Sequence, residues 1–195
     1  MTTRRSTQQR VTKETTVEVS VDLDGSGTTA ITTGVGMFDH LLSAFGHHRL
    51  IDLELTTEGD LHIDDHHTVE DSMLVLGAAI DEALGDRSGI VRYGDARVPM
   101  DEAIASCTLD FGGRPYAVID AEFRGEKMGT LSTQMIPHAL ESFARTARAT
   151  IHLSGSGRND HHVAEAMFKA LARATRAAVA IDERRRGIPS TKGTL

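Results

Sequence analysis

The spacing of apolar residues predicts three strands in the first half of the chain. Apolar and polar side chains alternate over residues 15–23 and again over residues 50–56, which is the period of a strand with one buried face. Between these segments, residues 24–27 (Asp-Gly-Ser-Gly) predict a turn, and the β-branched run 28–33 follows it. We therefore expect residues 28–33 to pair back on residues 15–23 as a hairpin.

Apolar residues three and four positions apart predict two helices in the same half. Residues 37–47 carry apolar side chains on one face. A second helix is expected to begin after Asp64 or Asp65, because either carboxylate is a suitable N-cap. Its apolar positions continue to Gly85, where we expect the helix to end.

The second half repeats this order of elements. Its predicted elements are, in chain order, strand 103–111, strand 116–123, helix 132–147, strand 150–153 and helix 160–180. The first two strands are joined through residues 112–115 (Gly-Gly-Arg-Pro), and Asp160 is the expected N-cap of the last helix. Each half is therefore predicted to be a β-β-α-β-α unit.

Two copies of one unit predict an α+β fold that arose by internal duplication, with antiparallel sheets that carry helices on one face. We expect a first half-repeat over residues 1–88, a second over residues 89–181, and a C-terminal tail over residues 182–195. No linker or low-complexity segment lies between the halves, so we expect them to form one compact unit.

Composition narrows the class of protein. The 195 residues are 39% hydrophobic and 25% charged, as in ordinary globular proteins, and the formal charge of -7 argues against nucleic-acid binding. No apolar run approaches the roughly 20 residues of a membrane span, and residues 1–10 lack the apolar stretch of a secretion signal. The single cysteine, Cys107, excludes an internal disulfide and is expected in the core. We expect a cytoplasmic protein without membrane or nucleic-acid partners.

A pair of histidines followed by a glutamate occurs twice, each time at the start of the last predicted helix of its half. A further histidine stands early in the first predicted helix of each half. Together these give eight candidate metal ligands, namely His40, His66, His67, Glu70, His138, His161, His162 and Glu165. The remaining histidines stand in no such pattern and are expected to be ordinary surface or core residues, namely His47, His48, His62 and His152.

Helix geometry divides each copy between two metal ions. Residues i and i+4 share a face whereas neighbours diverge by about 100°, so His66 and Glu70 can bind one ion while His67 points elsewhere. Four ligands for each of two ions result if the halves pack face to face and exchange their diverging histidines. Imidazole and carboxylate suit manganese, iron, zinc, cobalt or nickel, and the spacing does not distinguish among these divalent metals.

Three basic residues in glycine-bearing segments form a second group of candidates. Arg92, Arg114 and Lys192 have the side chains with which loops hold a phosphate. Solvated turn residues are the alternative interpretation of the same pattern.

Together, these motifs resemble the imidazoleglycerol-phosphate dehydratases of histidine biosynthesis. The resemblance runs from about residue 10 to the C-terminus. Its motifs are Phe38-Asp39-His40, residues 65–71, Gly113-Arg114-Pro115, His138 with residues 141–144, Asp160-His161-His162 with Glu165, and residues 189–193. Ala44 and Arg49 depart from it, because the family often has Gln and Gly there.

The resemblance implies a monofunctional lyase that converts imidazole-glycerol phosphate to imidazole-acetol phosphate and water, with two manganese ions per active site. It implies one ion on His40, His67, His161 and Glu165. It implies the other ion on His66, Glu70, His138 and His162. It further implies Glu14 as the acid/base carboxylate, and substrate or phosphate contacts from Arg92, Arg114, Ser190 and Lys192.

The resemblance also implies that each chain consists of two fused halves like ribosomal S5 domain 2. It implies that the chains assemble through trimers into a 24-subunit shell, in which neighbouring chains complete the active sites.

The proton on the substrate's C2 has no adjacent carbonyl, so a base alone would not remove it. Metal ions on both ring nitrogens would favour the imidazolate, which expels the C3 hydroxyl, while Glu14 moves the C2 proton.

Two other classes of function remain open. A two-metal hydrolase would need a metal-bridging water and usually a bridging carboxylate. A non-enzymatic metal-storage or metal-assembled structural protein would leave Glu14, Arg92, Arg114 and Lys192 without a role.

Overall fold

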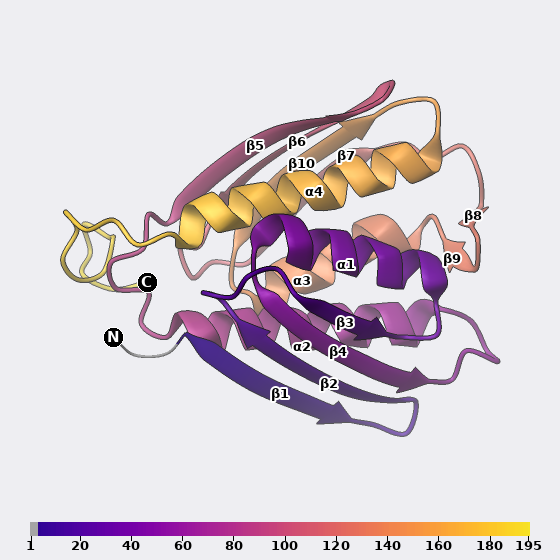
Figure 1. The fold of residues 1–195 in the computed structure, drawn as a ribbon, viewed down its shortest axis with the longest axis horizontal. Helices are drawn as coiled ribbons and strands as arrows, with labels where there is room; N and C mark the ends of the chain where they lie inside the picture. The colour runs from indigo at the N-terminus through magenta and orange to yellow at the C-terminus, as the bar shows by residue number, and fades with distance from the viewer. Residues whose placement is uncertain (1–3) are drawn as a thin grey trace.

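Two four-stranded sheets enclose four helices in this α+β molecule (Figure 1). The computed structural model describes residues 4–195. The first half contains β1 (Arg5–Val11), β2 (Thr15–Asp22), β3 (Thr29–Thr32), α1 (Gly36–Arg49), β4 (Asp52–Gly59) and α2 (His66–Leu84). The second contains β5 (Tyr93–Met100), β6 (Ala103–Asp110), β7 (Tyr116–Ala121), the short pair β8 (Lys127–Met128) and β9 (Leu131–Ser132), α3 (Met135–Thr146), β10 (Thr150–Ser156) and α4 (Asp160–Val179).

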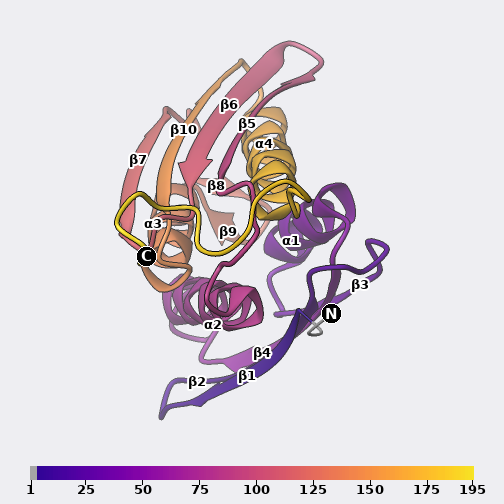
Figure 2. The same ribbon diagram turned by 90° about the vertical axis from the view of Figure 1, so that its left-hand side faces the viewer.

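The helices form two layers between the sheets (Figure 2). Helices α1 and α2 cover the inner face of the first sheet, and α3 and α4 cover the inner face of the second. Between the layers, α1 packs against α4 and α2 packs against α3. Each helix layer therefore belongs to one half, and the interface between the halves consists of helix pairs.

The two sheets have the same strand order, as a duplication predicts. The first sheet runs β1-β2-β4-β3 and the second β5-β6-β10-β7. In each sheet the last strand in this order lies parallel to its neighbour. Strand β3 lies parallel to β4, and β7 lies parallel to β10. The prediction of purely antiparallel sheets is wrong for these two pairs.

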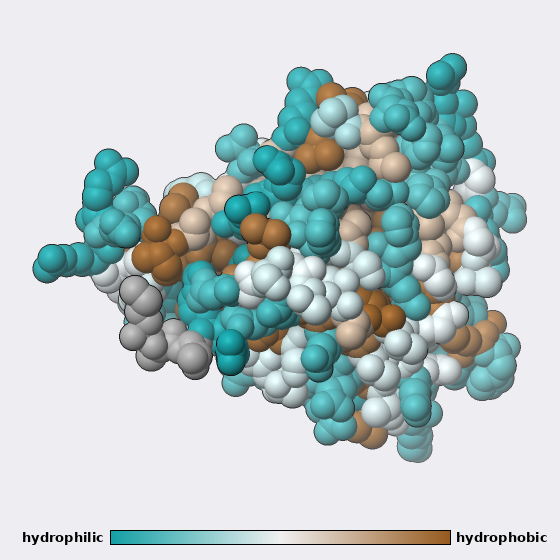
Figure 3. All heavy atoms as spheres, in the orientation of Figure 1, coloured by the Kyte–Doolittle hydropathy of each residue, from teal (hydrophilic) through white to brown (hydrophobic). Residues whose placement is uncertain are grey.

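One hydrophobic core joins the halves. Val17, Val19 and Val21 of β2 are buried and alternate with exposed or half-buried residues, as the sequence pattern predicts. Buried residues of all four helices and of β2, β4, β6 and β10 belong to a single cluster. The face shown in Figure 3 is mostly polar, with apolar residues in separate small patches. Within residues 4–195, no helix is both long enough and apolar enough to cross a membrane.

Each half has one more strand at its start than the predicted β-β-α-β-α unit. Strand β1 has the sequence RSTQQRV, in which only Ser6 is buried, so no apolar alternation marks it. Strand β5 contains Gly94 and Pro99, which are unfavourable inside strands. Both are edge strands that the backbone pairing with β2 and β6 holds in place.

The predicted hairpin of residues 28–33 with residues 15–23 is also wrong. The chain crosses the end of β4 and places β3 on the far side of that strand. The Asp52 carboxylate at the start of β4 accepts hydrogen bonds from the backbone N–H groups of Ser26, Gly27 and Thr28, which turns the chain across the sheet. The glycine-containing turn therefore makes a crossover rather than a tight hairpin.

The helix starts differ from the predictions by small amounts. Of the two predicted caps of α2, Asp65 accepts hydrogen bonds from the backbone and hydroxyl of Ser132 instead of capping the helix. The other, Asp64, accepts the backbone N–H of His66 at the start of the helix. The N-cap of α4 is Asn159, whose side chain accepts from the N–H of His161, and Asp160 is the first helical residue. Helix α3 begins at Met135, since Leu131 and Ser132 belong to β9.

Candidate metal centre

The candidate ligands lie near the N-terminal ends of the four helices. His40 is on α1, and His66, His67 and Glu70 are on α2. His138 is on α3, and His161, His162 and Glu165 are on α4. The parallel packing of α1 with α4 and of α2 with α3 brings these ends together in pairs.

Glu165, His40 and His161 form what we call the first trio. Nε2 of His40 and Nε2 of His161 each lie 3.1 Å from the same Glu165 oxygen, Oε2. The two rings are tilted by 39° with their centroids 5.4 Å apart. Three donor atoms within 4.8 Å of one another have the spacing of ligands to a single ion.

Glu70, His66 and His138 form the second trio. Nε2 of His138 lies 3.4 Å from Oε1 of Glu70, and Nε2 of His66 lies 3.7 Å from Oε2. Nε2 of His138 is buried and has no hydrogen-bond partner among the described residues. A buried polar atom without a partner requires an explanation, and a metal ion beside Glu70 supplies one.

Each trio draws on both halves of the chain. In the first trio, His161 and Glu165 come from the second half and His40 from the first. In the second trio, His66 and Glu70 come from the first half and His138 from the second. Residues i and i+4 share a face in both copies, as the helix argument predicts.

The diverging histidines do not reach the trios within one chain. Nδ1 of His67 lies 3.0 Å from Asp60, and Nδ1 of His162 lies 2.8 Å from Glu102. The expected exchange of these histidines between the halves is therefore wrong for a single chain. The divergence of about 100° between neighbouring helical residues directs them away from the interface that holds the trios.

Lys169 contacts the Glu165 oxygen that does not face the two histidines. Its Nζ lies 2.7 Å from Oε1, which leaves Oε2 facing His40 and His161. Burial by itself raises the pKa of the Glu165 carboxyl, but the hydrogen bonds from Lys169 and His40 outweigh it and bring the pKa to about 2. Glu165 is therefore a carboxylate at neutral pH, as a metal ligand must be.

An open hollow of about 730 Å³ lies in front of the first trio. Its lining includes His40, His161 and Glu165 together with residues 127–129 and Asn159. The trio is thus accessible to a small molecule from outside the chain.

Glu14 lies beside a diverging histidine. It stands in the turn between β1 and β2, and its Oε2 lies 3.7 Å from Nε2 of His67. Its side chain is 56% exposed, and among the described residues its carboxylate takes no hydrogen bond that restrains it. A carboxylate in this position is available to a substrate.

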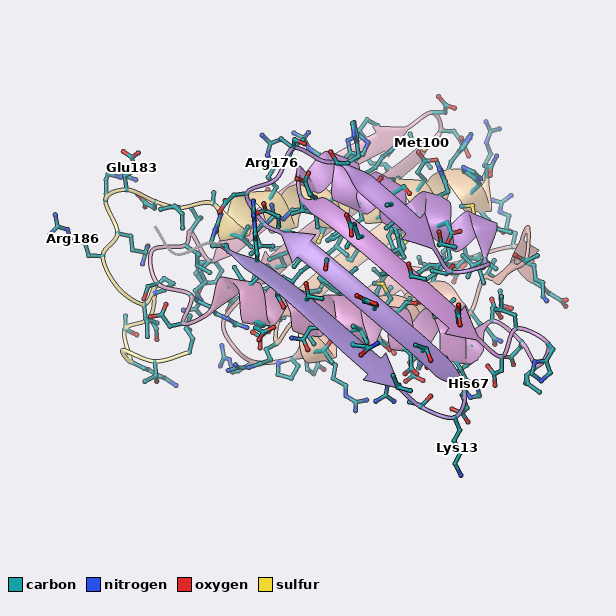
Figure 4. All side chains as sticks on the ribbon, turned by 60° about the horizontal axis from the view of Figure 1, so that its bottom comes forward. Lys13, His67, Met100, Arg176, Glu183 and Arg186 are labelled. Carbon is teal, nitrogen blue, oxygen red and sulfur yellow. The ribbon has the colours of Figure 1, made fainter. Side chains whose placement is uncertain are left out.

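The candidate phosphate residues lie at the other end of the molecule. The backbone N–H of Arg92 donates to the carbonyl of Ala178 in the last turn of α4, whereas His161 is in the first turn. Helix α4 has 20 residues and so spans about 30 Å. Figure 4 shows His67 at one end of the molecule and the tail residues Glu183 and Arg186 at the other.

Arg92 joins the tail to the second sheet. Its guanidinium makes two hydrogen bonds to the Asp110 carboxylate, at 2.6 and 2.9 Å, and donates to the carbonyl of Pro189. The hydrogen bond to Asp110 raises the pKa of Arg92, so its positive charge is secure. Of the five N–H bonds of the guanidinium, two remain for an anion.

Arg114, Ser190 and Lys192 lie near this end as well. Arg114 follows Gly113, which lies close to the C-terminal Leu195. The carbonyl of Arg114 accepts a hydrogen bond from the Thr150 hydroxyl at the start of β10. Lys192 is exposed, and its backbone N–H donates to the Ser190 hydroxyl. Within one chain, the candidate phosphate residues therefore lie far from the candidate metal ligands.

Sequence reasoning missed three residues that contact the candidate ligands. Lys169 is four positions after Glu165 on the same face of α4, so the helical spacing alone was a sufficient signal. Asp60 and Glu102 lie in connecting segments, and only the packing of the sheets against the helices brings them to His67 and His162. The predicted core position of Cys107 is confirmed, since its side chain is buried and burial raises the thiol pKa to about 12.

Comparisons with known proteins show which family this chain resembles. Residues 33–175 match the family model of imidazoleglycerol-phosphate dehydratase. Relatives of that name include one from Methanothermobacter thermautotrophicus, 52% identical over 195 residues with all of both chains covered. Another, from Methanosarcina mazei, is 50% identical over 186 residues, which cover 95% of this chain and 96% of the relative.

Two solved structures of imidazoleglycerol-phosphate dehydratases are similar to the whole fold. The enzyme from Staphylococcus aureus is 34% identical with a TM-score of 0.83, over 91% of this chain and 99% of that one. The enzyme from Pyrococcus furiosus, solved in complex with (S)-C348, is 35% identical with a TM-score of 0.83, over 96% of this chain and 100% of that one.

Proposed function

The chain belongs to the imidazoleglycerol-phosphate dehydratase family, and from that premise we propose that its two trios are the core of a two-metal active site. It is a lyase of histidine biosynthesis that acts on a small phosphorylated imidazole. We infer that it dehydrates imidazole-glycerol phosphate to imidazole-acetol phosphate in the cytoplasm. The observation that carries the proposal is the convergence of two His-His-Glu trios, each built across the duplicated halves.

The donor atoms suit divalent manganese. Each trio offers two imidazole nitrogens and one carboxylate oxygen within 4.8 Å, and the unpartnered Nε2 of His138 is aimed at Glu70. Zinc, iron, cobalt and nickel accept the same donors, and we propose manganese from the family resemblance. When bound, the ions supply Lewis acidity toward the ring nitrogens of the substrate.

We propose that His67 completes the first trio and His162 the second, each from a neighbouring chain. Both histidines lie in the first turn of a helix that carries trio residues, but neither belongs to a trio of its own chain, because neighbouring helical residues diverge by about 100°. The same arrangement accounts for the distance between the trios and the basic residues. Arg92, Arg114, Ser190 and Lys192 of one chain would hold the substrate phosphate at a trio of another. Assembly into trimers and a 24-subunit shell, as the family resemblance implies, would bring these parts together.

Glu14 is the proposed acid/base group. Overall, the substrate loses the C2 proton and the C3 hydroxyl as water, and the resulting enol becomes the ketone by taking up a proton at C3. The exposed carboxylate of Glu14 would accept the C2 proton, and the turn between β1 and β2 holds it beside His67. The hydrogen bonds of Arg92 to Asp110 and Pro189 fix the direction in which its two remaining N–H groups face the phosphate.

Replacing Glu14 by glutamine tests its role. The amide keeps the size of the side chain but cannot accept the proton, so we expect turnover to fall about 100-fold or more with no change in bound manganese. Turnover is measured from the ketone product after metal analysis of the same sample. A Glu14→Gln variant with a full complement of metal and near-normal turnover would remove Glu14 from this role.

The whole proposal is tested by incubating the manganese-loaded protein with imidazole-glycerol phosphate and assaying the ketone. Product formation that stops on chelation and returns with manganese is expected. Full metal occupancy without product would overturn the proposal. The two trios each have their own glutamate, and neither carboxylate bridges the two sets, so no observation favours a two-metal hydrolase.

A further inference from the structure

The two diverging histidines share a feature that the trios lack. In His67 and in His162 it is Nδ1, and not Nε2, that contacts a carboxylate, at 3.0 Å from Asp60 and 2.8 Å from Glu102. In all four histidines of the trios it is Nε2 that faces a glutamate. The same feature recurs in both halves, from carboxylates that lie in different connecting segments.

An ionised carboxylate only accepts hydrogen bonds, so Nδ1 of each diverging histidine must carry the hydrogen. In the neutral ring the lone pair is then on Nε2. The carboxylate oxygens closest to Nε2 among the ion pairs are those of Glu14 at 3.7 Å and Asp101 at 3.8 Å, both beyond hydrogen-bond distance. Each ring thus has an unprotonated Nε2 that none of these carboxylates reaches within hydrogen-bond distance.

We propose that Asp60 and Glu102 are positioning residues, which fix the tautomer and direction of His67 and His162 so that Nε2 is ready for a metal ion held by another chain. The inference rests on the proposed function, since it assigns these histidines to metal sites. A carboxylate on the far nitrogen of a histidine ligand orients the ring and raises its basicity. The side chains of Asp60 and Glu102 contact neither a trio nor the Glu14 carboxylate, and only the backbone N–H of Asp60 donates to the carbonyl of Glu14.

Glu102 is held more firmly than Asp60. Its Oε2 contacts His162, and its Oε1 accepts the backbone N–H groups of Arg158 and Asn159 just before α4. Both oxygens of Asp60 face only the ring of His67, at 3.0 and 3.2 Å. Glu102 therefore fixes the ring and the start of the helix that carries it, while Asp60 fixes the ring alone.

The duplication gives this assignment a further argument. The turn between β5 and β6 that carries Glu102 corresponds to the turn between β1 and β2 that carries Glu14. Glu102 is 23% exposed and its oxygens are taken by hydrogen bonds, whereas Glu14 is 56% exposed and contacts only the Nε2 side of His67. Equivalent turns thus supply a positioning carboxylate in the second half and a free carboxylate in the first, where Asp60 takes over the positioning.

The geometry predicts different effects for two conservative substitutions. In Glu102→Gln the single amide oxygen cannot accept from both His162 and the backbone N–H groups, so one contact is lost. In Asp60→Asn the amide oxygen can still accept from His67. We expect Glu102→Gln to weaken manganese binding at one class of site by about 10- to 100-fold, and Asp60→Asn to weaken the other class less.

The experiment is a manganese titration of the metal-free, full-length protein, read by electron paramagnetic resonance of the free ion. Glu54→Gln is the matched control, because it is the same substitution at an exposed acid on β4 that contacts neither diverging histidine. It should bind manganese like the unaltered protein. His162→Ala should lose the class of site that Glu102→Gln weakens.

The outcomes separate the two proposals. If the unaltered protein binds no manganese, the proposed function fails. If it binds two ions per chain and a folded Glu102→Gln variant matches Glu54→Gln, the positioning role is overturned while the metal site stands. The tautomer gives a second readout that needs no variant. Nitrogen-15 shifts of His162 in the metal-free protein, at a pH where the ring is neutral, should report hydrogen on Nδ1, and hydrogen on Nε2 would overturn the assignment.

Discussion

Single residues decide the charge of the centre, and Glu165 shows how. Lys169 occupies one of its oxygens, and the two histidine nitrogens meet at the other. Neutral imidazoles supply no charge to balance a divalent cation, so the glutamate in each trio provides the only negative charge among its three ligands. The proposed metal site accounts in this way for the same residue type at i+4 in both helices.

Removing that charge should remove one ion. We expect Glu165→Gln to reduce bound manganese from two ions per chain to one, because an amide oxygen binds a divalent cation more weakly than a carboxylate. Metal analysis after dialysis against dilute manganese measures the ratio. Glu18→Gln, an exposed acid on β2, is the control and should keep both ions. Two tightly held ions in Glu165→Gln would contradict the assignment.

Asp52 gives a residue-level prediction for stability against pH. The hydrogen bonds from the backbone of Ser26 and Thr28 lower the pKa of this carboxyl in the folded state. A lowered pKa in the folded state means that the charged form stabilises the fold above the unfolded-state pKa of about 3.9, and that this contribution is lost as the pH falls further. We therefore expect Asp52→Asn to lower the melting temperature between pH 5 and 8 relative to the unaltered protein, with the difference shrinking below about pH 4.

Calorimetry of both proteins from pH 3 to pH 8 measures this difference. Asp52→Ala also removes the acceptor oxygen, so it should be less stable than Asp52→Asn at every pH. A difference that is constant across the whole range would show that the charge of Asp52 does not contribute.

At the scale of elements, most helices and inner strands were predictable because their apolar periodicity is strong. Strand β2 alternates buried and exposed residues along its length, and the helices have apolar stripes. The edge strands β1 and β5 were not predictable, because backbone pairing and not side-chain burial specifies them. The crossover to β3 depends on Asp52, which lies more than twenty positions away from the turn that it holds. The pairs His66–Glu70 and His161–Glu165 followed from helical spacing. Which of His40 and His138 joins each pair depends on tertiary packing, as do the contacts of Asp60 and Glu102.

Gly94, which is unfavourable inside a strand, has a structural reason in β5. A Cβ on Gly94 would lie 2.0 Å from the carbonyl oxygen of Ala174, so only glycine lets α4 approach the strand this closely. We expect Gly94→Ala to reduce the free energy of unfolding by about 1–3 kcal/mol. Denaturant unfolding measures it. Gly36→Ala is the matched control, since nothing lies within 4 Å of a Cβ there, and it should unfold like the unaltered protein. Equal stability of the two variants would contradict this account of the packing.

At the scale of the whole molecule, the length of α4 separates two parts of one proposed active site. The first trio lies at its N-terminal end, and Arg92 with the tail lies at its C-terminal end, about 30 Å away. Since a substrate with a short glycerol phosphate chain cannot span that distance, one chain cannot supply both parts of the same site. Metal ions held between chains would then couple binding to assembly, so chelation should reduce the particle size in light scattering and manganese should restore it.

Mixing two inactive variants tests this division of labour directly. His161→Ala removes a ligand of the first trio, and Lys192→Ala removes a proposed phosphate contact at the other end of the chain. If each site combines the trio of one chain with the basic residues of another, a Lys192→Ala chain can provide the trio and a His161→Ala chain the lysine. We expect the mixture, dissociated by chelation and reassembled with manganese, to have dehydratase activity well above that of either variant alone. The double variant carried through the same steps is the control and should remain inactive. If mixing restores no activity although both variants assemble, each chain must complete its own site. The distance along α4 between the first trio and the basic residues would then need another explanation.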